Sequence, residues 1–161
     1  MYSLGLRLKD AISLSVDSID SSQMLVRIIS KRNKERIIPL PEQLLLALRE
    51  FWKTHRHPTW IFPGLYGRNH ICRKSLYRAF NGARDSIGLG SEVKLHSLRH
   101  SYATHLLESG VDIRSVQLFL GHANIRSTQI YTHMTEARRH EIRGEVDTLF
   151  SSFFAGGETN E

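Results

Sequence analysis

One stretch of the sequence is patterned as β-structure, and it constrains the fold more than any other feature. The runs MLVRII at 24–29 and ERIIPL at 35–40 are rich in β-branched residues, and the charged, turn-like segment SKRNK separates them. Two such runs around a short polar segment predict a β-hairpin. Its tip would carry Lys31, Arg32 and Lys34. The rest of the 161-residue chain lies outside this hairpin.

Helical periodicity covers most of the remaining chain. Apolar residues recur at spacings of three and four in several segments, and Gly110 and Gly121 suit the left-handed position that follows a helix. The expected helices span residues 4–16, 41–53, 69–87, 96–109 and 112–120, followed by a mostly helical stretch over 125–150. The predicted fold class is therefore α+β and mainly α-helical, with one small β-hairpin or sheet.

Composition narrows the class of partner. Lys and Arg number 22 against 16 Asp and Glu, which gives a formal net charge of +6 at pH 7 and favours an anionic partner such as nucleic acid or an acidic membrane surface. The apolar runs are far shorter than the roughly 20 residues of a membrane span, and the first residues lack the pattern of a secretory signal. The single cysteine, Cys72, can form no internal disulfide. Charge alone does not choose between these two anionic partners, but the short apolar runs and the lack of a signal pattern lead us to expect a cytoplasmic protein with no membrane partner.

The densest group of titratable residues is HSLRHSYATH, which begins at His96. His96 and Arg99 are three residues apart and share one face of the expected helix, so both side chains can point into one site. The pair Gly121-His122 and then Tyr131 follow along the chain.

These residues carry a resemblance to a known family. The stretch LHSLRHSYATHLLESGVDIRSVQLFLGHANIRSTQIYTHMT resembles the C-terminal signature of the tyrosine recombinases, the phage integrase family, which reads His-x-x-Arg, then Gly-His, then a nucleophilic Tyr. GLRLKDAISLSVDSID resembles the family's first arginine box and places its Arg at Arg7, with Asp10 where the family often has Glu. KRNKERIIPLP resembles the family's hairpin and places its catalytic Lys at Lys31. The similarity covers roughly residues 3–135 and is nearest to the Xer-like and integron-type members.

The resemblance implies the fold of a tyrosine recombinase catalytic domain and a metal-independent chemistry on DNA that needs no cofactor. Arg7 and Arg99 are cationic forks that can each bind a non-bridging phosphate oxygen bidentately. Their charge would offset the negative charge that grows in a pentacovalent phosphorus transition state. His122 would add a hydrogen bond to the same phosphate.

The resemblance also implies the covalent steps. Tyr131 would attack the scissile phosphate and remain attached as a 3′-phosphotyrosyl ester, so that bond energy is conserved and no ATP is needed. His96 would accept the tyrosine proton as general base, because an imidazole titrates near working pH. Lys31 would protonate the departing 5′ oxygen.

Basic residues outside the signature are candidates for further DNA contacts. The five we select for DNA binding are Arg32, Lys34, Arg73, Lys74 and Arg78. The last three form a stripe on the outer side of the helix expected over 69–87, where a solvated charged face is an equal alternative. Lys34 and Arg36 lie close enough to the hairpin tip to contact phosphate, but charges on a strand edge also prevent aggregation.

The implied partners are double-stranded DNA and further copies of the chain, in a tetramer on two duplexes. Residues 136–154, which contain several Phe, resemble the C-terminal helix that family members dock onto a neighbouring protomer, and folding back onto the same domain is the alternative. We expect a catalytic domain over 1–150, without the family's N-terminal core-binding domain and first helices. A flexible C-terminal tail is expected over 151–161.

Three alternatives to an active recombinase remain open from the sequence. The chain could be a truncated, catalytically impaired DNA-binding remnant of such an enzyme, or a monomeric enzyme of the type IB topoisomerase kind. A metal-dependent nuclease could use His96 and His100, which lie one helical turn apart, as ligands. Arg99 between them would repel a cation, so we expect no metal site.

Overall fold

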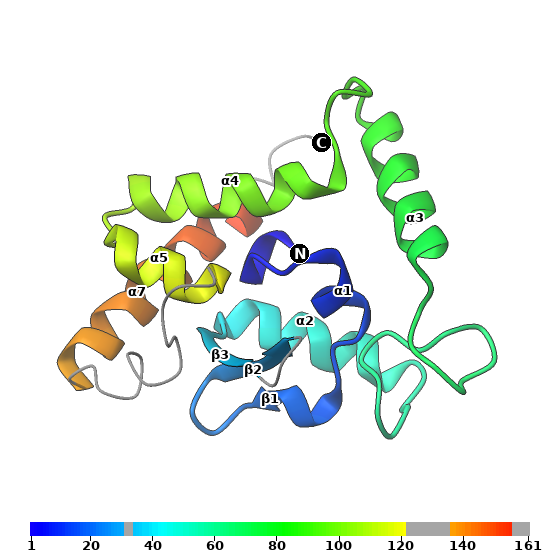
Figure 1. Cartoon of the computed structure of the whole chain (residues 1–161), viewed down its shortest axis with the longest axis horizontal. Coiled ribbons are helices and arrows are strands. Elements are labelled where there is room, and N and C mark those ends of the chain that lie inside the picture. The colour runs from blue at the N-terminus through cyan, green and yellow to red at the C-terminus, as the bar shows by residue number, and fades with distance from the viewer. Residues whose placement is uncertain (31–33, 122–135, 156–161) are drawn as a thin grey trace.

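The computed structural model describes residues 1–30, 34–121 and 136–155, and helices make up most of this part of the chain (Figure 1). The predicted hairpin forms, with β2 at Leu25–Ser30 and β3 at Lys34–Pro39, each within one residue of its expected position. A strand that the sequence did not predict, β1 at Ile19–Asp20, completes an antiparallel sheet in the order β1-β2-β3. Two residues are too few to show an alternating pattern.

The register of the hairpin runs from Leu25 opposite Pro39 to Ser30 opposite Lys34. Six-residue strands joined in this way bury Val26 and Ile38 completely, which fixes the face of the sheet that points into the core.

Most of the predicted helices form close to their expected positions. The α-helices are α1 (Leu8–Ile12), α2 (Glu42–Lys53), α3 (Arg73–Ser86), α4 (Leu95–Glu108), α5 (Ile113–Leu120) and α7 (Glu136–Ala155). The predicted stops are also confirmed, because Gly110 and Gly121 have φ angles of 93° and 66°. Of the stretch expected to be helical over 125–150, residues 125–135 lie outside the described part, and the remainder falls within α7.

The continuous helix predicted over 4–16 is wrong. A 3₁₀ helix, η1 (Tyr2–Leu4), ends at Gly5, α1 covers five residues, and a second 3₁₀ helix, η2 (Val16–Ser18), follows. The physical reason lies at Gly5, which takes a left-handed φ of 54° and presses against the ring of Tyr102. A Cβ at this position would lie 2.5 Å from that ring, so only glycine fits here, and its left-handed φ ends the 3₁₀ helix before α1 begins.

One hydrophobic core joins the sheet to α2, α4, α5 and α7. Its most deeply buried residues come from separate elements: Val26, Ile38, Leu106, Phe119 and Ile142 have no exposed surface. Figure 1 shows α4 lying across α5 and α7, with the N-terminal residues between α4 and the sheet. The first residues of the chain are therefore held against α4 in the interior.

The last helix folds back onto its own domain. The Gln43 amide donates to the Ser151 hydroxyl, and the Glu42 N–H donates to Asp147, so α7 is tied to the start of α2. The helix ends at Ala155, so its last turn extends past the domain boundary that we placed at residue 150. Neither α7 nor any other helix of the described ranges is both long and apolar enough to cross a membrane.

The helix α3 stands apart from this core, at the right of Figure 1. It begins at Arg73, four residues later than expected, and none of its residues is buried. Its predicted apolar stripe forms, but Leu76 and Phe80 remain partly exposed, and Ile87 just beyond its end is 71% exposed.

Candidate active site

Two arginines far apart in the sequence meet at the C-terminal end of α5. Arg99, from α4, is buried and donates to the carbonyl oxygens of Gly5 at 2.5 Å and Leu120 at 2.6 Å. Arg7, the exposed N-cap residue of α1, donates to the carbonyl oxygen of Gly121 at 2.9 Å. Two neighbouring peptide groups thus orient both guanidinium groups.

A third arginine lies behind this pair. The side chain of Arg36, on β3, is only 2% exposed, and its Nη2 donates to Asp10 Oδ2 at 2.8 Å. Its Nη1 also approaches the Leu120 carbonyl oxygen, at 3.4 Å, so Arg36 and Arg99 share that acceptor.

The suggestion that Arg36 contacts phosphate or guards a strand edge is therefore wrong. Both faces of β3 are covered, since residues 36–40 are all buried, and the side chain points inward to Asp10. No local signal in the sequence marks this burial, because Arg36 follows the charged residues Lys34 and Glu35 and only precedes the apolar run.

Gly121 makes this arrangement possible. It ends α5 with a φ of 66°, a conformation that residues with a side chain rarely adopt. A Cβ here would also lie 2.8 Å from Arg36 Nη1 and 2.9 Å from its Cδ. Glycine therefore lets the backbone at the end of α5 approach the buried guanidinium closely.

The cluster carries more positive than negative charge. It holds the three guanidinium groups of Arg7, Arg36 and Arg99 against the single carboxylate of Asp10. Burial, and then the charges of Arg7 and Arg36, lower the pKa of Arg99 to about 10. Burial also lowers the pKa of Arg36, and the Asp10 carboxylate opposes that effect. Both groups stay cationic at neutral pH, so the site favours an anion.

The comparison with known proteins now decides the family. Residues 1–138 of the chain match the profile described as "Phage integrase family". The chain belongs to the phage integrase family. The resemblance that the sequence motifs indicated, and the fold class it implied, are confirmed.

Curated relatives from this family are about twice as long. A putative integrase/recombinase of Sinorhizobium fredii, y4qK, is 40% identical over 131 residues, which cover 81% of this chain and 42% of the relative. The tyrosine recombinase XerD of Listeria monocytogenes serotype 4b is 35% identical over 150 residues, covering 88% and 50%. The chain thus spans about half the length of the relatives it matches.

Solved structures of phage integrase family members share the fold. The integrase from mycobacterium phage Brujita superposes with a TM-score of 0.71 at 27% identity, over 92% of this chain and 48% of that protein. The XerH site-specific recombinase, bound to difH substrate in a pre-cleavage complex, gives 0.69 at 26% identity, over 87% and 42%.

Of the four other predicted residues of the integrase site, the structure describes only one. His96 is exposed on α4, one turn before the buried Arg99. Lys31, His122 and Tyr131 lie outside the described residues. His122 and Tyr131 belong to residues 122–135, which directly follow Gly121, and the carbonyl oxygen of Gly121 accepts from Arg7.

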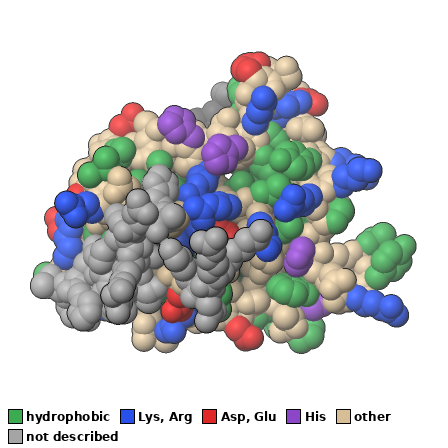
Figure 2. All heavy atoms as spheres, in the orientation of Figure 1, with side chains coloured by type: hydrophobic (Ala, Val, Ile, Leu, Met, Phe, Trp, Pro, Cys, Tyr) green, Lys and Arg blue, Asp and Glu red, His purple; other side chains and the backbone are tan. Residues whose placement is uncertain are grey.

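The predicted DNA contacts fall in two places. Arg73, Lys74 and Arg78 are all exposed on α3. Lys34 is the first residue of β3, where its backbone pairs with Ser30, and Arg32 lies outside the described residues. Figure 2 shows Lys and Arg side chains gathered in the middle of one face of the molecule, beside His side chains.

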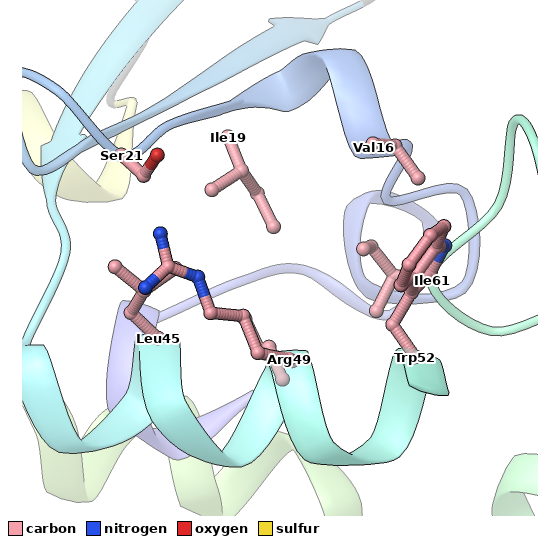
Figure 3. A pocket seen from close by; sticks show the side chains of 8 residues that line it. Val16, Ile19, Ser21, Leu45, Arg49, Trp52 and Ile61 are labelled. Atoms are coloured by element: carbon pink, nitrogen blue, oxygen red, sulfur yellow. The ribbon is translucent and has the colours of Figure 1, made fainter. Parts of the chain in front are cut away.

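A separate pocket lies between α2 and the segment from η2 to β1 (Figure 3). Its volume is about 200 Å³, and most of its lining is apolar, including Trp52 and Ile61. The guanidinium group of Arg49 lies over this pocket on the side of Ser21. The pocket shares no residue with the arginine cluster. In the described part of the chain, no three side chains that could bind a metal ion lie together.

Proposed function

We propose that this chain is the catalytic part of a site-specific DNA recombinase, which cleaves and rejoins strands through a 3′-phosphotyrosyl intermediate at Tyr131. One observation carries the proposal. Arg7 and Arg99, which lie far apart in the sequence, are fixed on the adjacent carbonyl groups of Gly121 and Leu120. The catalytic domain would extend over about residues 1–150.

The arginine pair would bind the scissile phosphate. Each guanidinium has five N–H donors, and the backbone carbonyls occupy only some of them, so others remain for non-bridging oxygens. Because Arg99 is buried and already oriented, little reorganisation is needed when charge develops on phosphorus. This use of fixed cations needs no metal ion.

The covalent steps balance as a transesterification. The Tyr131 oxygen forms a bond to phosphorus while the bond from phosphorus to the 5′ oxygen breaks. His96 would take the phenol proton and Lys31 would supply a proton to the leaving oxygen, with His122 as a further donor to the phosphate. Attack by a 5′-hydroxyl on the phosphotyrosine reverses the step and rejoins a strand.

Double-stranded DNA is the proposed partner, in the cytoplasm. Exposed cations on α3, together with Arg32 and Lys34, would neutralise backbone phosphates. The XerH neighbour was captured on its difH substrate, which supports the same use of the shared fold.

We further propose that the chain works as a tetramer on two duplexes, joined through the C-terminal helix. The contacts that α7 makes with α2 within one chain are contacts that α7 of a second copy can make in its place.

The test is a covalent-adduct assay. Full-length protein is mixed with end-labelled nicked duplexes that tile the DNA around its gene, with chelator present, and run on a denaturing gel beside Tyr131→Phe. A shifted band in the wild type alone establishes a metal-free phosphotyrosyl enzyme, because a nick lets the short fragment that carries the freed 5′-hydroxyl diffuse away before rejoining.

Each other result has a definite meaning. An adduct that persists in Tyr131→Phe excludes the assigned nucleophile. No adduct, with salt-dependent binding to the same duplexes, favours the impaired DNA-binding remnant. Cleavage that the chelator abolishes would favour a metal-dependent nuclease.

A further inference from the structure

We propose that Arg36 is a positioning residue that holds Asp10 away from Arg7 and Arg99, so that these two guanidinium groups stay available for phosphate. The inference rests on the function proposed above, because it concerns the same site. Arg36 itself would not touch the DNA, since its side chain is 2% exposed.

One carboxylate, that of Asp10, lies among the three cations of the arginine cluster. Asp10 follows Arg7 by one turn at the start of α1, and its charge favours the cationic form of Arg99, although burial and the charges of Arg7 and Arg36 outweigh it and lower the pKa of Arg99. The side chain of Asp10 is only 10% exposed, so water screens these interactions weakly. Any of the three arginines is therefore an electrostatically suitable partner for Asp10.

Asp10 forms an ion pair with only one of these three arginines. Asp10 pairs with Arg36 at 2.8 Å, while Arg7 and Arg99 donate to backbone carbonyls. A carbonyl is neutral and occupies one N–H, whereas a carboxylate would occupy the bidentate fork that a phosphate needs. The Asp10–Arg36 pair thus separates the acid from the anion site.

The third step concerns what burial of Arg36 costs. A buried ion pair adds little net stability, and apolar residues of similar volume often replace one without loss. The Nε of Arg36 is buried with no hydrogen-bond partner among the described residues, which adds to the cost. Stability alone therefore gives a weak reason for an arginine here, and control of Asp10 gives a specific one.

The test is a rescue experiment on the full chain. Arg36→Met keeps much of the side-chain volume and removes the charge, which frees Asp10 to pair with Arg7 or Arg99. Adding Asp10→Asn removes the competing carboxylate. Inorganic phosphate is titrated into the wild type and both variants, and the Nε–H NMR signals of Arg7 and Arg99 report binding independently of any reaction on DNA.

The expected result is a loss followed by recovery. Arg36→Met should raise the dissociation constant for phosphate about 10- to 100-fold, on the scale of a lost charged hydrogen bond. The double variant Arg36→Met/Asp10→Asn should return to within about threefold of the wild type. Arg36→Lys, which can still pair with Asp10, should bind phosphate better than Arg36→Met.

Other results overturn the inference. A double variant as weak as Arg36→Met would mean that Arg36 only supports the fold, and a wild type whose Arg7 and Arg99 signals ignore phosphate would remove the anion site altogether. If Arg36→Met does not fold, the pair Arg36→Gln and Arg36→Gln/Asp10→Asn repeats the test, and failure of both pairs to fold assigns Arg36 to the core. Recovery of phosphate binding without any DNA adduct in the wild type would refute the proposed reaction while leaving the role of Arg36 intact.

Discussion

The helices α3 and α4 have the same length, 14 residues, but occupy opposite environments. α4 buries four residues, Leu95, Arg99, Tyr102 and Leu106, whereas α3 buries none. From the sequence alone, α3 has the clearer division into an apolar and a basic face. An amphipathic pattern therefore predicts that a helix forms, while burial depends on what else packs against it.

The cations on the two helices differ in the same way. Arg99 of α4 is buried and fixed by two carbonyls, whereas Arg73, Lys74 and Arg78 of α3 are exposed. A fixed cation can act on one developing charge, while exposed cations contribute to affinity through the release of counterions. The two helices thus divide the proposed work into chemistry and binding.

The largest expected difference between the two helices is in the stability lost when one apolar side chain of each is truncated. Leu106→Ala in α4 should lower the free energy of unfolding by about 2–5 kcal/mol, because Leu106 is completely buried and a cavity would remain. Leu76→Ala in α3 should cost less than about 1 kcal/mol, because that side chain is partly exposed. Chemical denaturation measures both, and equal losses would show that α3 is packed in solution.

The second effect is on the proposed reaction. Arg99→Ala should slow adduct formation about 10²–10³-fold, equivalent to about 2.7–4 kcal/mol of transition-state stabilisation. Arg99→Lys keeps the charge but loses the fork, and should recover only part of the rate. Thermal unfolding of each variant controls for loss of fold, and an unchanged rate in folded Arg99→Ala would refute the site.

A smaller effect is expected on α3. Arg78→Ala should weaken DNA binding about tenfold at low salt and reduce the slope of log affinity against log salt by about one, without changing stability. Arg84→Ala is the matched control, because Arg84 is only 15% exposed and is paired with Asp85 at 2.7 Å. Identical salt slopes for the two variants would argue that the outer face of α3 is merely solvated.

The smallest effect concerns the helix starts. Asp112 caps α5 by accepting from the Ser115 N–H, whereas Cys72 at the start of α3 makes no side-chain cap. Asp112→Ala should therefore cost about 1 kcal/mol of stability, and Cys72→Ala should cost almost nothing. Denaturation of the two variants side by side measures this difference.

The Asp112 contribution should also depend on pH. Burial opposes ionisation, but hydrogen bonds from Ser115 and Arg138 outweigh it and lower the pKa of Asp112 to about 2, from an ordinary value near 4. A lowered pKa means that the charged form stabilises the fold above about pH 4, and that this stabilisation is lost as the pH falls toward 2. The stability difference between wild type and Asp112→Ala should shrink over that range, and a constant difference would contradict the assignment.

Much of the fold could be predicted because its signals are local. Two β-branched runs around a charged turn predicted the hairpin, and the glycines at 110 and 121 marked two helix ends correctly. The order of the motifs indicates the family, which the profile match confirms, and it predicts that Arg7 and Arg99 act on the same phosphate.

The features of the fold and site that could not be predicted depend on contacts between segments that are far apart in the sequence. The bend at Gly5 arises from the ring of Tyr102, and the burial of Arg36 arises from Asp10 and the end of α5. Neither contact leaves a periodic trace in the sequence. The exposure of α3 is a third example, because its pattern is that of a helix with a buried face.

The end of α5 has a mechanical consequence. The carbonyl of Leu120 accepts from Arg99 and lies near Arg36, and the carbonyl of Gly121 accepts from Arg7, so three arginines are attached to one turn of backbone. A small rotation of this turn would tilt the guanidinium groups together, not one by one. Arg7 and Arg99 would then gain or lose their contacts with the phosphate together, through a movement of the final turn of α5.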